Sequence, residues 1–278
     1  MAPTGPPRGA FWDELPPPKL IVQSDHVASA KELHSAILAF NQMPTLTSLR
    51  LDLEVAALTS ALKSDPCYDL VRSSEGHVSF VRQGSEPSDR SARTETFDFH
   101  TDGLYLVDPP DCCGLFCLDE GRGDIPTVFV DSRTVLRRLV GSGVSLEFLL
   151  NVKQGYTDRR GQRHVYNIVR RHPRFSFPVL QYFSGRDALT KNSHFSSDND
   201  EELTQLKERI DFYIADTAST RIGWSKKLFV VWDNYTYLHA RPSVSPDPCR
   251  ILARYWLKKI DRQPTPLAIP TMMEAASR

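Results

Sequence analysis

The sequence predicts a mainly β protein with peripheral helices, arranged as a double-stranded β-helix, or jelly roll. From His77 onward, about nine short apolar runs with strand character follow one another along the chain. Long connections separate these runs, and segments with helical spacing are few. A roll of this kind has an open mouth in which a small ligand can bind among inward-facing side chains.

The helices are expected in four places. Residues 27–40 and 45–63 repeat apolar side chains every three or four positions, as an amphipathic helix does. A third helix is expected after Asp131, which has the character of a helix cap. A fourth follows the acidic run 198–202, because negative charge stabilises a helix N-terminus.

The strands are expected from alternating or continuous apolar runs bounded by turn residues. They cover residues 77–82, 104–107, 115–118, 127–130, 164–170, 177–183, 228–232, 235–241 and 250–258.

The chain reads as one jelly-roll domain spanning residues 1–278, without internal repeats or a separating linker. The lead-in 1–18 is rich in proline and glycine and is expected to be flexible. Residues 19–76 are expected to form a helix-rich part that packs on the β core.

Composition excludes several classes of protein. Lys and Arg number 34 against 34 Asp and Glu, so nothing points to a nucleic-acid or membrane-surface partner. No run is long and apolar enough to span a membrane, and the start lacks a signal peptide. Five cysteines do not suggest a disulfide framework. We therefore expect a cytoplasmic protein that binds a small molecule, with a homo-oligomer possible.

The pair His100 and Asp102 predicts a metal site. Residues i and i+2 of a β-strand point to the same side, so both side chains can approach one ion. His239, 139 residues after His100, completes two imidazoles and one carboxylate. That set holds iron(II) on one face and leaves the other face open. One such His-x-acid pair is expected by chance in this composition, so the interpretation depends on the neighbouring motifs.

Two motifs accompany the ligands. Thr127 begins a short apolar strand 27 residues after His100 and offers a hydroxyl group. The Asp233–Asn234 turn between two apolar runs predicts a β-hairpin whose second strand carries His239.

Arg250 and Arg254 lie on the predicted strand that follows the strand of His239. On a strand, Arg250 and Arg254 face the same side as Leu252 and Trp256. The opposite side of that strand is also largely apolar, so at least one of the arginines is expected to be buried. A buried guanidinium requires an anion.

The order of His-x-Asp, Thr, distal His and Arg resembles the iron(II)/2-oxoglutarate dioxygenases of the taurine dioxygenase and clavaminate synthase-like superfamily. The resemblance covers residues 95–135 and 228–258, and these segments look like those of taurine dioxygenase, γ-butyrobetaine hydroxylase and carbapenem synthase. One departure is that Ile125 and Pro126 separate Asp124 from Thr127, where the family usually has Gly-Gly-Asp/Glu-Thr.

The resemblance implies a role for each residue of the motif. Three side chains would bind iron(II), and Arg250 with Thr127 would bind the distal carboxylate of 2-oxoglutarate. Arg254 would hold an anionic group of the prime substrate. The implied iron ligands are His100, Asp102 and His239.

The implied reaction converts 2-oxoglutarate and O2 to succinate and CO2 and oxidises an unactivated C–H bond of a small polar substrate. Because Asp102 is retained, hydroxylation is favoured over halogenation, which in this superfamily requires a small residue there. Desaturation and cyclisation use the same ligands. A cupin-like metal site without a keto acid and a non-catalytic jelly-roll binding module remain alternatives.

Substrate residues are expected beside the metal motif. Strand alternation places Thr96 and Asp98 on the same face as His100, and Tyr105 follows the motif. An inward Asp98 together with Arg254 would suit a zwitterion, such as a free amino acid or a natural-product precursor. Asp98 could equally pair with a neighbouring arginine.

Overall fold

A computed structural model gives the structure of the protein. It describes residues 19–39, 43–72, 76–82, 95–104, 106–122, 125–157, 162–175, 177–184, 189–190, 201–243 and 250–260.

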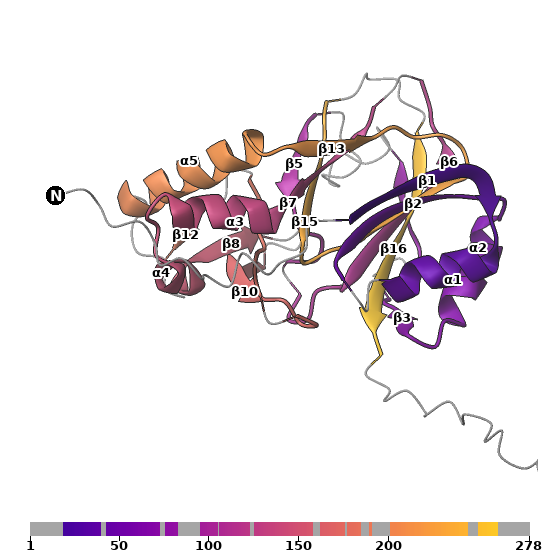
Figure 1. Cartoon of the computed structure of the whole chain (residues 1–278), viewed down its shortest axis with the longest axis horizontal. Helices are drawn as coiled ribbons and strands as arrows, with labels where there is room; N and C mark the ends of the chain where they lie inside the picture. The colour runs from indigo at the N-terminus through magenta and orange to yellow at the C-terminus, as the bar shows by residue number, and fades with distance from the viewer. Residues whose placement is uncertain are drawn as a thin grey trace, which may run out of the picture.

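Two antiparallel-rich sheets form the centre of the molecule and confirm the predicted jelly roll (Figure 1). The larger sheet runs in the order β1 (Lys19–Ala28), β2 (Thr45–Leu51), β14 (Leu228–Asp233), β6 (Cys112–Asp119), β16 (Ile251–Lys259) and β3 (Tyr68–Leu70), with β4 (Ser79–Arg82) also paired to β16. The smaller sheet runs in the order β13 (Ser219–Ile222), β7 (Thr127–Asp131), β15 (Tyr237–Arg241) and β5 (Phe97–His100). Only the β1–β2 pairing among these is parallel.

Helices cover the outer faces of both sheets (Figure 1). α1 (Ala30–Ala39) and α2 (Val55–Lys63) share one apolar cluster with the larger sheet. α3 (Ser132–Gly141), α4 (Leu146–Asn151) and α5 (Glu201–Ala215) share another with the smaller sheet. Beside them lie the short strands β8 (Lys153–Thr157), β9 (Arg163–Asn167), β10 (Val169–Arg171), β11 (Pro178–Leu180) and β12 (Leu189–Thr190). None of the helices that the structure describes has the length and apolar character needed to span a bilayer.

The residues of β14 show how the sequence builds these layers. Phe229 and Val231 belong to the cluster under α1 and α2. Val230 and Trp232 belong to the cluster between the two sheets. Successive side chains of a strand point to opposite faces, so a continuous apolar run is required where both faces are buried.

The helix predicted for residues 45–63 is wrong in its first half. Residues 45–51 form β2, which lies between β1 and β14, and only Val55–Lys63 are helical. The leucines of this segment fit both a helix and a strand. Thr45 and Thr47 are β-branched and buried between neighbouring strands, where branched side chains pack well. The part 19–76 therefore contributes strands to the main sheet as well as helices.

The strand predicted for residues 104–107 is also wrong, because the described residues of this segment form turns and bends. Gly103 has φ +67°, and the Leu106 N–H donates to its carbonyl oxygen at 2.8 Å. A Cβ atom at Gly103 would lie 2.8 Å from Cδ of Pro110, so both the conformation and the close packing require glycine.

The turn after Asp233 exists, but the predicted hairpin does not. β14 belongs to the larger sheet and β15 to the smaller one, and the two strands do not pair. The turn carries the chain from one sheet to the other. It thereby places Trp232 and His239 on facing sheets, with ring centroids 4.7 Å apart.

Candidate metal centre and co-substrate cavity

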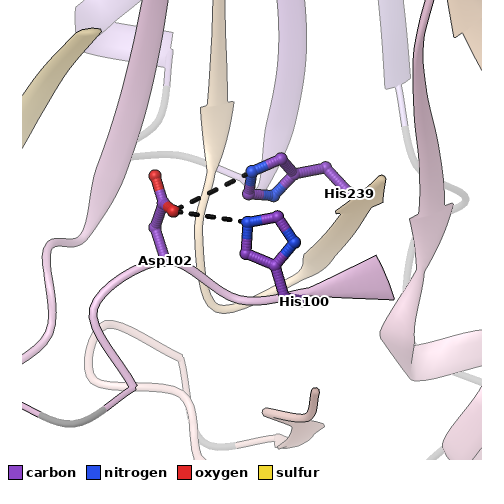
Figure 2. Close-up of side chains that lie close together, drawn as sticks. All are labelled: His100, Asp102 and His239. Atoms are coloured by element: carbon purple, nitrogen blue, oxygen red, sulfur yellow. Dashed lines mark ion pairs between the residues drawn. The ribbon is translucent and has the colours of Figure 1, made fainter. Parts of the chain in front are cut away.

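His100, Asp102 and His239 come together between the two sheets (Figure 2). One ligand atom from each lies within 4.8 Å of the others, and all three residues are buried. His239 on β15 pairs directly with His100 at the end of β5. Asp102 lies in the turn after β5 rather than on the strand, so the turn supplies the convergence that strand alternation was expected to give.

The hydrogen bonding of His100 leaves a lone pair facing the centre. Its Nδ1 lies 2.8 Å from the carbonyl oxygen of Asp98, which can only accept, so Nδ1 carries the proton. In the neutral form of the ring, the lone pair is therefore on Nε2, which lies 3.5 Å from Oδ1 of Asp102. Nε2 of His239 lies 4.0 Å from the same oxygen. Lone pairs that converge in this way suit a cation.

The pKa shifts of His239 and Asp102 suit the binding of a divalent metal. Burial and the neighbouring His100 ring lower the pKa of His239 to about 3, so its imidazole is neutral at neutral pH. Burial alone would raise the pKa of Asp102, but His100 and the charges nearby, including Arg254, hold that pKa well below its usual value. Two neutral imidazoles and one carboxylate are the donor set expected for iron(II).

The cavity around this centre is lined by both sheets. The smaller sheet contributes Phe97, Thr127 and Arg241, and the larger sheet contributes Leu252 and Arg254. The remaining lining residues beside the three candidate ligands are Val81, Leu115, Trp232, Ala240 and Arg250.

Arg250 and Thr127 are fixed by neighbouring groups. Nη1 of Arg250 donates to the carbonyl oxygen of Ile125 at 2.7 Å, so one of the two residues that interrupt the family motif anchors the arginine. The indole N–H of Trp224 donates to Oγ1 of Thr127 at 3.1 Å. Burial and the nearby charge of Arg241 lower the pKa of Arg250 to about 10. An anion bound here would stabilise the charged guanidinium and raise this pKa again.

Comparison with protein-family models shows which family the chain belongs to. The model described as "Taurine catabolism dioxygenase TauD, TfdA family" matches residues 25–256. The chain belongs to the TauD/TfdA family. It is therefore an iron(II)- and 2-oxoglutarate-dependent dioxygenase, with iron(II) and 2-oxoglutarate as its cofactor and co-substrate. A comparison with curated proteins finds no match.

Solved structures share the fold of this TauD/TfdA-family chain. PvcB of Pseudomonas aeruginosa has 21% sequence identity and a TM-score of 0.61, with 83% of this chain and 80% of that chain covered. Asparagine oxygenase has 14% identity and a TM-score of 0.60, covering 81% and 79%. A taurine dioxygenase from Burkholderia xenovorans has 14% identity and a TM-score of 0.58, covering 87% and 85%.

The structure does not bring the predicted substrate residues of β5 into the cavity. Thr96 and Asp98 are exposed and do not line it. The pairing shifts between His239–His100 and Arg241–Phe97, so this bulge places Phe97 rather than Asp98 beside His100, with ring centroids 4.0 Å apart. Asp98 instead lies near Asp211 on α5. Burial of the Asp211 carboxyl group raises its pKa, and the nearby Asp98 adds to this rise. Tyr105 lies outside the described residues.

On β16 the alternation is confirmed, because Arg250, Leu252 and Arg254 all line the cavity. The expectation of a buried arginine is also confirmed, since Arg250 is 2% exposed.

Several residues of the site were not predicted as functional. Asn234 appeared in the sequence only as a turn residue, yet its amide binds the backbone of Asp102 through both of its atoms, at 3.0 and 2.9 Å. Trp256 donates its indole N–H to Oδ2 of Asp102 at 2.9 Å. Strand alternation from Arg254 does place Trp256 on the cavity side, and that signal could have found it. Strand alternation from His239 likewise places Arg241, two residues later, on the cavity side.

Proposed function

We propose that this TauD/TfdA-family enzyme hydroxylates an unactivated C–H bond of a small polar molecule that carries an anionic group. A free amino acid or a natural-product precursor fits this description. The observation that carries the proposal is one cavity between the sheets that is lined by the candidate metal ligands together with Thr127, Arg250 and Arg254. In the reaction, 2-oxoglutarate and O2 become succinate and CO2.

The proposed ligands of iron(II) are His100, Asp102 and His239. Held by these three residues, iron(II) would supply the redox chemistry in which oxidative decarboxylation of 2-oxoglutarate provides electrons for the reduction of dioxygen. The two neutral imidazoles and the single carboxylate leave the ion with a net positive charge that favours an anionic co-substrate. The presence of Asp102 supports hydroxylation rather than halogenation.

Arg250 and Thr127 are proposed to bind the distal carboxylate of 2-oxoglutarate. A guanidinium presents parallel N–H groups that match the two oxygens of a carboxylate, and it stays protonated even when its pKa falls to about 10. The hydrogen bond from Nη1 of Arg250 to the carbonyl oxygen of Ile125 fixes the orientation of the guanidinium. Apolar lining from Val81, Leu115 and Leu252 excludes water from the same space.

Arg254 is proposed to hold the anionic group of the prime substrate. The described residues that line the cavity include three arginines but one carboxylate, that of Asp102. A molecule recognised through an anionic group fits this charge distribution better than one recognised through an ammonium group. The fold is shared with asparagine oxygenase solved with Fe(II), 3-hydroxyasparagine and succinate, which supports an amino acid as a candidate.

The decisive experiment adds Fe(II) and 2-oxoglutarate to the protein without oxygen and records the visible metal-to-keto-acid charge-transfer band. His239→Ala should abolish the band. Arg250→Ala should raise the 2-oxoglutarate concentration at half-saturation at least about tenfold, because hydrogen bonds to a charged group are lost. Arg209→Ala, an exposed arginine on α5, serves as the matched control and should leave the titration unchanged. A folded wild-type protein without the band would refute the proposed function.

Substrate identity can be tested by succinate release with a panel of free amino acids and the amides of the same amino acids. Amino acids should stimulate release and the amides should not, since the amides lack the carboxylate that Arg254 would bind. Mass spectrometry of the product should show the gain of one oxygen. Loss of two hydrogens would identify desaturation instead.

We also propose that the chain works as a single jelly-roll domain in the cytoplasm. Cys67, Cys112, Cys113 and Cys117 are free thiols, which suits a reducing compartment. Cell fractionation followed by immunodetection tests this location.

A further inference from the structure

The two oxygens of Asp102 have different surroundings. Oδ1 faces the imidazoles, 3.5 Å from Nε2 of His100 and 4.0 Å from Nε2 of His239. Oδ2 accepts a hydrogen bond from the indole N–H of Trp256 at 2.9 Å. The carboxylate is therefore already divided between a metal-facing oxygen and an oxygen held by the protein.

The side chain of Trp256 is held by its surroundings. Trp256 is 9% exposed and pairs with Cys113 across the β16–β6 ladder. The guanidinium of Arg254 lies over the indole, 5.1 Å from the ring centroid. Nε of Arg254 donates to Oγ of Ser79 on β4 at 3.0 Å, which fixes the arginine in turn. The indole N–H consequently has a defined direction toward Asp102.

This arrangement has a consequence for coordination. A carboxylate can bind a metal through one oxygen or through both. A hydrogen bond to Oδ2 occupies one of its lone pairs and fixes the plane of the group, so Oδ1 is the better donor. Binding through both oxygens would use one more position on an ion that must also accept 2-oxoglutarate and dioxygen.

We propose that Trp256 is a positioning residue of the metal centre, whose indole N–H holds Oδ2 of Asp102 so that the carboxylate binds iron(II) through Oδ1 alone. The inference rests on the proposed function, because it takes His100, Asp102 and His239 as the iron ligands. Trp256 also belongs to the apolar cluster between the sheets. A purely structural role requires its ring but not its N–H, and this difference can be tested.

The test removes the N–H with and without the ring. Trp256→Phe removes the donor and part of the ring. Site-specific replacement of Trp256 by 3-benzothienylalanine keeps the bicyclic shape and substitutes sulfur for the N–H. The readouts are the Co(II) dissociation constant and the visible absorption spectrum of the Co(II)-loaded protein, which reports coordination number. Both variants should bind Co(II) about tenfold more weakly than wild type, the effect expected for the loss of a group that orients a metal ligand.

Tyr255→Phe provides a matched control on the same strand. Tyr255 faces the opposite side of the sheet, where its hydroxyl lies 3.3 Å from Oγ1 of Thr59 on α2. Its removal should change neither Co(II) affinity nor the spectrum. Circular dichroism and thermal unfolding establish whether each variant is folded. If Trp256→Phe does not fold, the benzothienylalanine protein decides, since it retains the packing.

The outcomes separate this inference from the proposed function. A benzothienylalanine protein with wild-type Co(II) affinity and spectrum would show that Trp256 only packs, and the inference would be wrong while the function stood. A wild-type protein that binds neither Co(II) nor Fe(II) with 2-oxoglutarate would refute the proposed function and, with it, the inference. A weakened affinity with an altered spectrum in both variants supports the inference.

Discussion

At the scale of single residues, Asn234 connects the turn between the sheets to the metal centre. Its Nδ2 donates to the carbonyl oxygens of Asp102 and Pro110, at 2.9 and 3.0 Å. Its Oδ1 accepts the N–H of Asp102 at 3.0 Å. The side chain is fully buried, so each of these bonds satisfies a backbone group that water cannot reach.

Asn234→Leu should destabilise the protein by about 2–4 kcal/mol, because buried backbone donors and acceptors lose their partners while the volume is kept. Urea unfolding of the metal-free protein measures the change. Asn151→Leu is the control, since Asn151 is exposed and its side chain donates to the Glu147 carbonyl oxygen of its own helix. Equal stability of the two variants would contradict the role assigned to Asn234.

Thr127→Val should weaken 2-oxoglutarate binding about tenfold, because a hydroxyl hydrogen bond to a carboxylate contributes about 1.5 kcal/mol. The substitution preserves the branched shape of the side chain. The charge-transfer titration without oxygen measures the affinity. Thr217→Val, at the end of α5 and away from the cavity, should leave the affinity unchanged. An unaltered titration for Thr127→Val would remove Thr127 from the co-substrate site.

Strand alternation predicted correctly which side chains of β16 face the cavity, but its prediction for β5 was wrong. On β16 the pairing with β6 is regular from Leu252 onward, so Arg254 and Trp256 face the cavity side as the period of two predicts. On β5 the pairing shifts between Phe97 and His100, and the bulge places Phe97 where Asp98 was expected. No local residue pattern announces this shift, because it arises from the pairing with β15.

At the scale of elements, a buried ionic network holds the end of β14. Asp233 is ion-paired with Arg174 and accepts a hydrogen bond from Nε2 of His172 at 3.1 Å. It also accepts the backbone N–H groups of Tyr235 and Thr236, at 3.1 and 2.9 Å. The network thereby ties the β10–β11 connection to the turn that positions the metal centre.

Asp233→Asn should lower the free energy of unfolding at pH 7 by about 3–5 kcal/mol, because Arg174 would remain buried without its counter-charge. Urea denaturation measures this change. Asp216→Asn is the control, since that carboxylate is exposed and pairs with Arg138 at the surface. A loss for Asp233→Asn no larger than that of the control would contradict the network.

The same carboxylate gives a pH dependence. Burial alone would raise the pKa of Asp233, but His172 and Arg174 lower it to about 2. Because the pKa of Asp233 is lower in the folded protein than in the unfolded chain, its charged form stabilises the fold at pH values above the unfolded pKa. This stabilisation is lost as the pH falls toward the folded pKa of about 2. The stability difference between wild type and Asp233→Asn should therefore shrink by about 2 kcal/mol between pH 5 and pH 2. A difference that stays constant over this range would show that Asp233 does not titrate as described.

The segment 45–63 shows why an element can be misassigned from its pattern. Its apolar residues satisfy a helical period and a strand at the same time, and local propensity does not choose between them. The choice is made by β14, whose residues 228–232 pair with 46–50 of β2. A partner 180 residues away in the sequence is invisible to any local pattern.

At the scale of the whole molecule, two sheets carry helices on their outer faces (Figure 1), and side chains from both sheets line the cavity. His100 and His239 come from the smaller sheet, and Trp256, which holds Asp102, comes from the larger one. Arg250 and Arg254 also belong to the larger-sheet side. Binding of metal and co-substrate at the proposed residues should therefore join the two sheets and stabilise the fold as a unit.

Mn(II) with N-oxalylglycine, which carries two carboxylates as 2-oxoglutarate does, should raise the thermal midpoint. At ligand concentrations about 100-fold above the dissociation constant, mass action adds about 2.7 kcal/mol, which corresponds to a shift of about 5–10 °C. Differential scanning calorimetry measures the shift, and EDTA should reverse it. His239→Ala should show no shift. A shift of the same size in that variant would place the binding elsewhere.

The sequence alone determined the jelly-roll class, the family resemblance and the candidate residues of the centre, because these depend on side-chain chemistry and on short-range spacing. The TauD/TfdA-family match then confirmed the class of enzyme. Tertiary structure decided which faces meet: the bulge that excludes Asp98, the turn that joins two sheets instead of a hairpin, and the indole that holds Asp102. These features arise from pairing and packing between segments far apart in the chain, and such contacts leave no local pattern in the sequence.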